Sequence, residues 1–232
     1  MFWYLKCNLT EISGRIVFYS KIPDIYEKLF HPSYKSEWEE FYPDAEEEIP
    51  RNDPPPRGNR VYGGCYVGAD HSGNLLTRRS HTEIIIFVNN SPIIWYSKRQ
   101  NTVDSSSFGS EFIVSQIATE MIEVLRYKLR RFGVPINGPA DVFCDNQAVV
   151  TNLIIPSSVL KKKQNSICYH RVREAHIAGM IRVGWISDEY NKSDIGTKKT
   201  IPTKRRYKLL NYIFNEKVST ITKESHGDDG ET

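Results

Sequence analysis

The sequence is poor in cysteine and contains no long apolar run. Structural zinc sites require paired cysteines, and a secreted chain held together by disulfides requires many. The chain contains no C-x-x-C pair, the N-terminus turns polar too early for a signal peptide, and no membrane-length apolar stretch occurs. These absences predict an intracellular protein, cytoplasmic or nuclear, with no membrane segment. The four cysteines, far apart in the sequence, are Cys7, Cys65, Cys144 and Cys168.

The composition is that of a globular protein whose charge is unevenly distributed. Hydrophobic residues make up 39% and aromatic residues 12% of the 232 residues, which suffices for a real core. The formal net charge is +3. Residues 37–53 contain eight acids and one base, whereas residues 54–214 contain 23 Lys and Arg against 12 Asp and Glu. A basic domain favours polyanions such as nucleic acid, although a lysine-rich solvated surface explains the charge equally well.

The chain divides into three parts where its composition changes. Residues 1–58 combine a predicted N-terminal strand and hairpin with the acidic run, and they close on PPPRGN, a stiff and extended connection. We place the boundary of the main domain at about residue 58, so that this domain covers residues 59–214. The polar tail, residues 215–232, is expected to be disordered.

Hydrophobic periodicity predicts an α/β domain with a mixed sheet and helices on its faces. Three β-rich runs, at 61–70, 81–90 and 92–100, predict an antiparallel meander. Apolar residues on one face predict a long helix over 105–133, begun by serines and ended by Gly133. The remaining pattern predicts two more strands, over 140–146 and 181–187, and helices over 147–154, 161–179 and 203–214.

Three acids fall near the ends of separate predicted elements. Glu111 falls in the first turn of the long helix, Asp145 ends the fourth strand, and Asp194 follows the fifth strand. We expect these side chains to converge, because chemistry gathers where the strands of such sheets end. Clustered carboxylates repel one another unless a cation such as magnesium or manganese occupies the cluster. Each acid also has a structural explanation, as a favourable charge near a helix N-terminus or as a helix cap.

Several motifs resemble the ribonuclease H domain of copia-type retrotransposon polyproteins. In that family V-D-A-D-x-A-G precedes T-R-R-S-x-T-G, and this sequence has YVGADHSGN and then TRRSHTE at 77–83. The resemblance covers about residues 60–200 and continues through SPIIWYSKRQNTVDSSSFGSEF, VFCDNQAVV, LKKKQNSICYHRVREA and NKSDIGTK. The segment before it resembles the connection that follows the reverse transcriptase in these polyproteins. The chain therefore looks like a fragmentary or degenerate copy without the polymerase.

The resemblance implies an RNase H-like fold and a nuclease that cuts the RNA strand of an RNA–DNA hybrid. In the family, four acids hold two magnesium or manganese ions, which activate the attacking water and stabilise the leaving oxygen. Glu111, Asp145 and Asp194 match the second, third and fourth acids, and the first acid falls on Gly68. The partners implied are an RNA–DNA hybrid and a reverse transcriptase domain. Nothing in the sequence indicates an oligomeric state.

The glycine at position 68 predicts weak or lost catalysis. In the family the first acid bridges both metal ions, so its loss weakens both sites. Asp70 lies on the same face of the strand, but a shift of two residues moves a side chain by about 6.5–7 Å. Magnesium holds its ligands at about 2.1 Å in strict geometry. Asp70 is therefore a doubtful substitute, which would need a bulge or a change of register.

Further departures from the family pattern point the same way. Gly196 and Lys199 stand where the family has the apolar residue and the proline of D-I-F-T-K-P-L. Glu83 stands where it has the glycine after R-R-S-x-T. We interpret these changes as mutations in a retrotransposon copy that is no longer selected for activity.

Binding can outlast catalysis, because basic side chains neutralise phosphates independently of a metal site. The alternative function is therefore a non-catalytic nucleic-acid-binding or domesticated interaction module. An integrase-like core fits less well, because it would carry its acids in D-D-E order. Trp95 and Trp185, inside strands, are predicted to be core residues. The candidate nucleic-acid-binding residues are Arg78, Arg79, Lys98, Arg99, Lys161, Lys162, Lys163, His170, Arg171 and Arg173.

Overall fold

The structure is a computed structural model that describes most of the chain between residues 37 and 214. The hairpin expected before residue 30 and the tail predicted to be disordered lie outside the described residues, as do Lys161, Lys162 and Lys199. No described helix combines the length and the apolar character needed to cross a membrane. The described residues are Phe30, Glu37, Trp38, 40–74, 76–89, 91–104, 106–160, 163–198 and 201–214.

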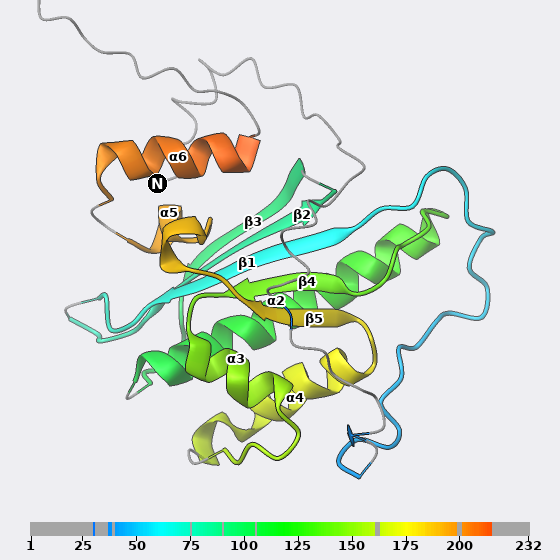
Figure 1. Ribbon diagram of the computed structural model, residues 1–232, viewed down its shortest axis with the longest axis horizontal. Helices are drawn as coiled ribbons and strands as arrows, with labels where there is room; N and C mark the ends of the chain where they lie inside the picture. Colours follow the sequence, from blue (N-terminus) through cyan, green and yellow to red (C-terminus); the bar gives the residue numbers. More distant parts are fainter. Residues whose placement is uncertain are drawn as a thin grey trace, which may run out of the picture.

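A five-stranded mixed sheet forms the centre of the molecule (Figure 1). Its strands lie in the order β3-β2-β1-β4-β5. The first three strands in sequence pair antiparallel, and β4 and β5 extend the sheet in parallel from β1. This arrangement confirms the predicted meander and the α/β fold class. The strands are β1 (Gly63–Asp70), β2 (His81–Val88), β3 (Ser91–Arg99), β4 (Ala140–Cys144) and β5 (Ile181–Trp185).

Helices cover both faces of the sheet (Figure 1). α2, α3 and α4 pack on one face, and α5 and α6 pack on the other. The Ser106 side chain caps α2 by accepting a hydrogen bond from the Gly109 N–H group, and Gly133 takes a positive φ of 72° just beyond the helix. The helices are α2 (Ser107–Arg131), α3 (Gln147–Ile154), α4 (Ser166–Ile177), α5 (Asp194–Thr197) and α6 (Thr203–Phe214), with short 3-10 turns at η3 (Lys163–Asn165) and η4 (Asp188–Tyr190).

Alternation along the central strands supplies a core on each face. In β1, Cys65 and Val67 join the larger core under α2, α3 and α4, whereas Tyr66 between them joins the smaller core under α6. In β2, Ile84 and Ile85 divide between the two cores in the same way. Because successive side chains of a strand point to opposite faces, a strand buried on both sides needs this near-continuous apolar sequence.

Three element boundaries differ from the sequence-based prediction. Glu111 is the fifth residue of α2 and lies beyond its first turn, because the helix begins at Ser107. Asp194 is the first residue of α5, a short helix that was not among the predicted elements. The helix predicted over 161–179 begins only at Ser166, because the preceding residues form η3.

The acidic run before the main domain packs against α2 and α4. Trp38 is fully buried, and its ring lies 4.4 Å from the guanidinium carbon of Arg173. The Glu47 carboxylate pairs with Arg126 at 2.7 Å and with Arg130 at 2.5 Å. This segment therefore contacts the helical side of the domain, and the domain boundary expected after it stays a prediction.

Candidate metal centre

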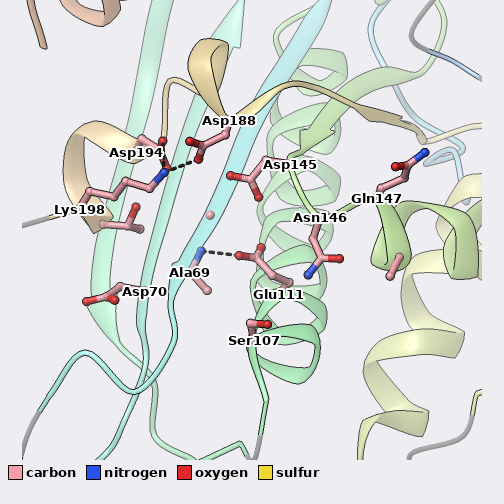
Figure 2. Close-up of a pocket in the computed structure, with 13 residues that line it drawn as sticks. Ala69, Asp70, Ser107, Glu111, Asp145, Asn146, Gln147, Asp188, Asp194 and Lys198 are labelled. Carbon is pink, nitrogen blue, oxygen red and sulfur yellow. Dashed lines mark hydrogen bonds and ion pairs between the residues drawn. The ribbon is translucent and has the colours of Figure 1, made fainter. Parts of the chain in front are cut away.

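Carboxylates from four separate elements meet at one end of the sheet (Figure 2). Glu111 comes from α2, Asp145 directly follows β4, Asp188 begins η4, and Asp194 begins α5. They line an open cleft of about 550 Å³. Oxygen atoms of Asp145, Asp188 and Asp194 lie within 4.8 Å of one another, and ligand atoms of Glu111, Cys144 and Asp145 form a second such group. The structure thus brings the three predicted acids together.

Asp188 is the carboxylate that the sequence reasoning missed. It lies in the turn after β5, where a charged residue usually signals only a solvated loop. Its position six residues before Asp194, just past the end of a strand, is the signal that could have identified it. Burial raises the pKa of Asp188, but the Lys198 ammonium and the Arg205 guanidinium beside it outweigh that effect and lower the pKa.

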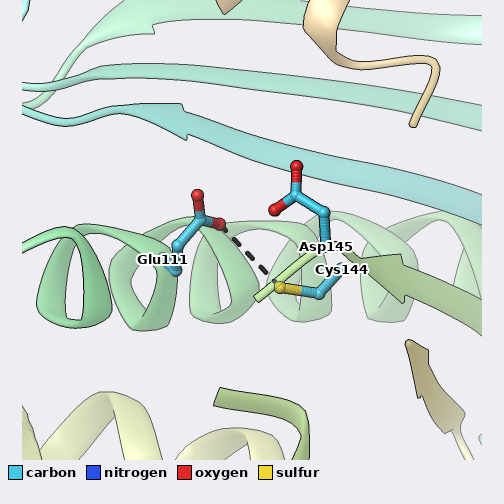
Figure 3. A group of neighbouring side chains, drawn as sticks. All are labelled: Glu111, Cys144 and Asp145. Carbon is cyan, nitrogen blue, oxygen red and sulfur yellow. Dashed lines mark hydrogen bonds between the residues drawn. The ribbon is translucent and has the colours of Figure 1, made fainter. Parts of the chain in front are cut away.

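Glu111 is held by backbone on one side and by a thiol on the other (Figure 3). The Ala69 N–H group donates to Glu111 Oε1 at 2.9 Å, and Cys144 Sγ lies 3.9 Å from Oε2. Only 5% of the residue is exposed. Burial, followed by the negative charge of Asp145, raises the pKa of Glu111 to about 8. The protein alone therefore disfavours the charged form of this side chain.

Asp145 is positioned by Asn191, which is fully buried. Asn191 Nδ2 donates to Asp145 Oδ2 at 3.1 Å and to the Val67 carbonyl oxygen at 2.9 Å, so it ties η4 and α5 to β1. Burial raises the pKa of Asp145, against the effect of the Asn191 hydrogen bond. Trp185 is 39% exposed, so its predicted core position is wrong; β5 lies at the sheet edge, and the Trp185 Nε1–H group donates to the Asp145 carbonyl oxygen.

Asp194 is buried and faces two cationic side chains. Lys198 Nζ lies 2.8 Å from Asp194 Oδ2, and Arg205 Nη2 pairs with the same oxygen. Burial nevertheless raises the pKa of Asp194 to about 6, because the effect of the Lys198 ammonium is smaller than that of desolvation and the neighbouring Asp188 charge adds to it. Lys198 also pairs with Asp188, so it bridges two carboxylates of the cluster (Figure 2).

The donor set fits a hard divalent cation. All four acids offer carboxylate oxygens, which magnesium and manganese prefer, and Asp145 belongs to both groups of neighbouring ligands. The pKa values of Glu111, Asp145 and Asp194 are all raised, so protein groups do not fully compensate the three charges. A divalent cation would supply the missing compensation.

Gly68 lines the same cleft, but the space for a side chain there is filled. An ideal Cβ atom at this position would lie 2.5 Å from Ser193 Oγ and 3.8 Å from Asn191 Nδ2. Ser193 is fully buried, and its hydroxyl donates to Asn191 Oδ1 at 2.8 Å. The position expected for the first acid therefore faces the start of α5, which packs directly onto β1.

Asp70 lies apart from the acid cluster (Figure 2). Its carboxylate folds back over Gly73, where an added Cβ atom would overlap it. Burial lowers the pKa of His81 on the paired strand, against the smaller opposing effect of the Asp70 charge. Among the residues that the structure describes, Asp70 belongs to neither group of close ligand atoms. Asp70 does line the same cleft, and its role as a substitute acid stays a prediction.

The predicted basic residues separate into two sets. Arg78, Lys98 and Arg99 are exposed, and Arg79 is half-buried. Asp70, the last residue of β1, pairs with His81 of β2, and His81 pairs with Arg99 of β3. This set therefore lies at the end of the sheet where β1 ends, which is also the end that carries the acid cluster.

The second set lies along η3 and α4, and part of it is engaged within the protein. Arg173 is 1% exposed, and its guanidinium donates to the carbonyl oxygens of Asn152 and Pro156. Buried in this way, Arg173 presents almost no surface to a phosphate, which argues against its assignment as a nucleic-acid contact. Arg171 pairs with Glu123. The exposed Lys163 and His170 complete this set, with His170 Nδ1 2.6 Å from the hydroxyl of Tyr42.

The similar proteins found by sequence are Pol polyproteins of transposons. No protein-family model matches the chain. The chain is 25% identical over 142 residues to the "Retrovirus-related Pol polyprotein from transposon RE2" of Arabidopsis thaliana, and 28% identical over 143 residues to that from transposon RE1 of the same plant. It is 28% identical over 134 residues to that from transposon TNT 1-94 of Nicotiana tabacum. These matches cover 61%, 61% and 57% of the chain but only 10% of each relative.

Similar solved structures include LC11-RNase H1 in complex with an RNA/DNA hybrid, at 14% identity and a TM-score of 0.45. That match covers 61% of this chain and 96% of the other. Another is the N-terminal RNase H domain of Rv2228c from Mycobacterium tuberculosis, fused to maltose-binding protein, at 12% identity and a TM-score of 0.43, with 65% and 97% covered. The strand order and strand directions described above are those of an RNase H-like α/β fold, as the sequence predicted.

Proposed function

We propose that this chain, a homologue of retrotransposon Pol polyproteins with an RNase H-like fold, binds RNA–DNA hybrids and is impaired in cleaving their RNA strand. The observation that carries the proposal is the convergence of Glu111, Asp145 and Asp194 in a cleft that Gly68 also lines. These three predicted acids suit a divalent cation, and the space beside Gly68, where the resemblance places the first acid, is filled by Ser193.

The carboxylates of the cluster would together provide the ligands for magnesium or manganese ions. Asp145 would contribute to holding such ions together with Glu111 and with Asp188 and Asp194, because it belongs to both groups of neighbouring ligand atoms. Bound divalent ions in such a site activate water and stabilise the leaving oxygen. Asn191 keeps the Asp145 carboxylate aimed into the cleft, and the Ala69 N–H group does the same for Glu111.

The charge balance explains why catalysis would be weak. Lys198 and Arg205 partly offset the charges of Asp188 and Asp194, which lowers the attraction for a cation on that side. A carboxylate at position 68 would restore negative charge near the shared ligand, but glycine offers none. Asp188 supplies a carboxylate from another direction, and it is exposed and engaged by Lys198.

The test is cleavage of a labelled RNA–DNA hybrid with magnesium or manganese. The parent chain is expected to cleave at least about 10–100-fold more slowly than the double variant Gly68→Asp/Ser193→Ala. The second substitution is needed because Ser193 Oγ occupies the space of the new side chain; Gly68→Asp alone is expected to gain less.

The matched control is Gly68→Asn/Ser193→Ala, which has nearly the same shape without the charge and is expected to stay inactive. Adding Asp145→Asn to the Asp-containing variant should abolish any gain. Robust cleavage by the parent, lost in Asp70→Asn, would overturn the proposal that position 68 limits the reaction.

Non-catalytic binding of nucleic acid is the second candidate function. It is favoured by the exposed Arg78, Lys98 and Arg99 at the acid-bearing end of the sheet, which can neutralise phosphates without a metal ion. Titration of the parent chain with hybrid, at low salt and without divalent ions, tests it. Tight binding that weakens as salt increases supports this function, and no binding at low salt rejects it.

A further inference from the structure

Glu83 is a fully buried carboxylic acid that neither acid group of the described residues contains. It lies on β2 directly opposite Gly68 of β1, on the face covered by α5. The Trp95 Nε1–H group donates to Glu83 Oε1. Burial raises the pKa of Glu83 to about 7, against hydrogen bonds from Ser97 and Trp95. Burial of an acid at this cost indicates that its shape and its hydrogen bond matter at this position.

Gly196 of α5 lies against the Glu83 carboxyl group. A Cβ atom at position 196 would lie far inside van der Waals contact with the carboxyl carbon and with both carboxyl oxygens of Glu83. The carboxyl group would have to leave Trp95 to make room, and because Glu83 is 0% exposed it has no route to solvent. α5 can therefore approach β2 this closely only because residue 196 has no side chain.

The same kind of contact occurs one strand away. Gly68 of β1 leaves room for Ser193, just as Gly196 of α5 leaves room for Glu83. Gly68 and Glu83 are directly opposed across the β1–β2 pair, so the two contacts are neighbours. Asp194 lies between Ser193 and Gly196 in sequence, and its backbone position is thus set by a contact on either side.

We propose that Glu83 is a positioning residue, which seats α5 on β2 through Gly196 and thereby places the Asp194 carboxylate in the metal centre. Glu83 and Gly196 are complementary in volume: the large side chain lies on β2, and the residue without a side chain lies on α5. The sequence pattern indicates drift at both positions, and the structure shows in addition that the two residues are in direct contact. The part of the inference that concerns cation binding rests on the proposed function.

A double-mutant cycle in thermal unfolding tests the contact. Gly196→Phe forces a ring into the Glu83 carboxyl group, and Glu83→Gly leaves a cavity, so each is expected to lower the melting temperature by at least about 5 °C. The double variant Glu83→Gly/Gly196→Phe is expected to recover most of the loss. Losses that simply add overturn the proposal. If Gly196→Phe does not fold, the cycle of Gly196→Ala with Glu83→Ala makes the same comparison with smaller changes.

A second measurement separates positioning from stability alone. At a temperature where every variant is folded, Gly196→Ala is expected to weaken manganese binding about tenfold, measured by electron paramagnetic resonance, and Glu83→Ala/Gly196→Ala to restore it. Gly64→Ala is the matched control, because its added Cβ atom meets only ordinary contact at 3.9 Å from Phe87; no change is expected. Equal manganese binding by the parent and Gly196→Ala overturns the positioning role. A parent that binds no manganese overturns the proposed function instead, while the unfolding cycle still decides the Glu83–Gly196 contact.

Discussion

Glu111 accepts a hydrogen bond from the Ala69 N–H group, and burial together with the neighbouring Asp145 raises its pKa to about 8. The folded state thus binds a proton on this residue at pH values where the unfolded chain, with the ordinary value of about 4.5, has lost it. Stability associated with Glu111 is therefore fully present below pH 4.5 and is lost as the pH rises toward 8. A carboxylate buried to bind a cation therefore destabilises the folded protein when it is charged and the cation is absent.

Glu111→Gln is accordingly expected to stabilise the metal-free protein. The amide keeps the acceptor for Ala69 and cannot ionise, so the melting temperature should rise by about 3 °C or more at pH 8, and the gain should vanish near pH 4.5. Thermal unfolding in a chelator across this pH range measures it, with the exposed Glu120→Gln on the same helix as control. A gain that does not depend on pH would show that Glu111 stays charged in the folded protein.

The acidic segment shows how an element that looks like a linker can belong to the packed structure. The Glu47 carboxylate lies between Arg126 and Arg130 on α2, and Arg126 also donates to the Gly138 carbonyl oxygen. Burial acts to raise the pKa of Glu47, but hydrogen bonds from both arginines outweigh it and lower the pKa to about 2. The stabilisation is therefore present above the ordinary value of about 4.5 and is lost as the pH falls toward 2.

Glu47→Ala is expected to lower the free energy of unfolding by about 2 kcal/mol, because it removes charged hydrogen bonds that are partly shielded from water. Urea unfolding at pH 7 measures the loss, and the difference from the parent should shrink below pH 4. Glu48→Ala, at the exposed neighbouring position, is the control and is expected to change little. Equal effects of both substitutions would mean that the segment does not dock on α2.

At the scale of the whole molecule, the sheet places basic and acidic groups at the same end. The acid cluster lies where β1 and β4 end, and Lys98 and Arg99 lie where β3 ends beside it. Arg57 and Arg60 are also exposed, but they precede β1 and lie toward its opposite end. A hybrid that contacts the acid cluster would therefore lie near Lys98 and Arg99 and far from Arg57 and Arg60.

Lys98→Ala/Arg99→Ala is expected to weaken hybrid binding and to reduce the slope of log affinity against log salt by about 1 to 2. The slope falls because binding releases fewer counterions when fewer phosphate contacts form. Fluorescence anisotropy over a series of salt concentrations measures the slope. Arg57→Ala/Arg60→Ala removes the same charge and should leave the slope nearly unchanged. A similar fall in both variants would assign binding to net charge and not to this end of the sheet.

The sequence by itself determined the elements and the location of the acids. Alternating and continuous apolar runs predicted the five strands, and the helical spacing predicted α2, because these periodicities depend only on neighbouring residues. Glu111, Asp145 and Asp194 could be assigned from their positions at element ends, and the structure brings them together. Asp188 has the same kind of signal, since it follows the end of β5, but the role of Asn191 comes only from its contacts with β1 and with Asp145.

Only the tertiary structure decided what fills the space between segments that are far apart in the chain. It placed Ser193 in the space above Gly68, set Glu83 against Gly196, and buried Arg173 beside Trp38. Local pattern carries no information on these pairs, because each joins residues that are more than 100 positions apart and depends on how closely two backbones approach. The glycine at position 68 can be read in the sequence; the packing of Ser193 against it cannot.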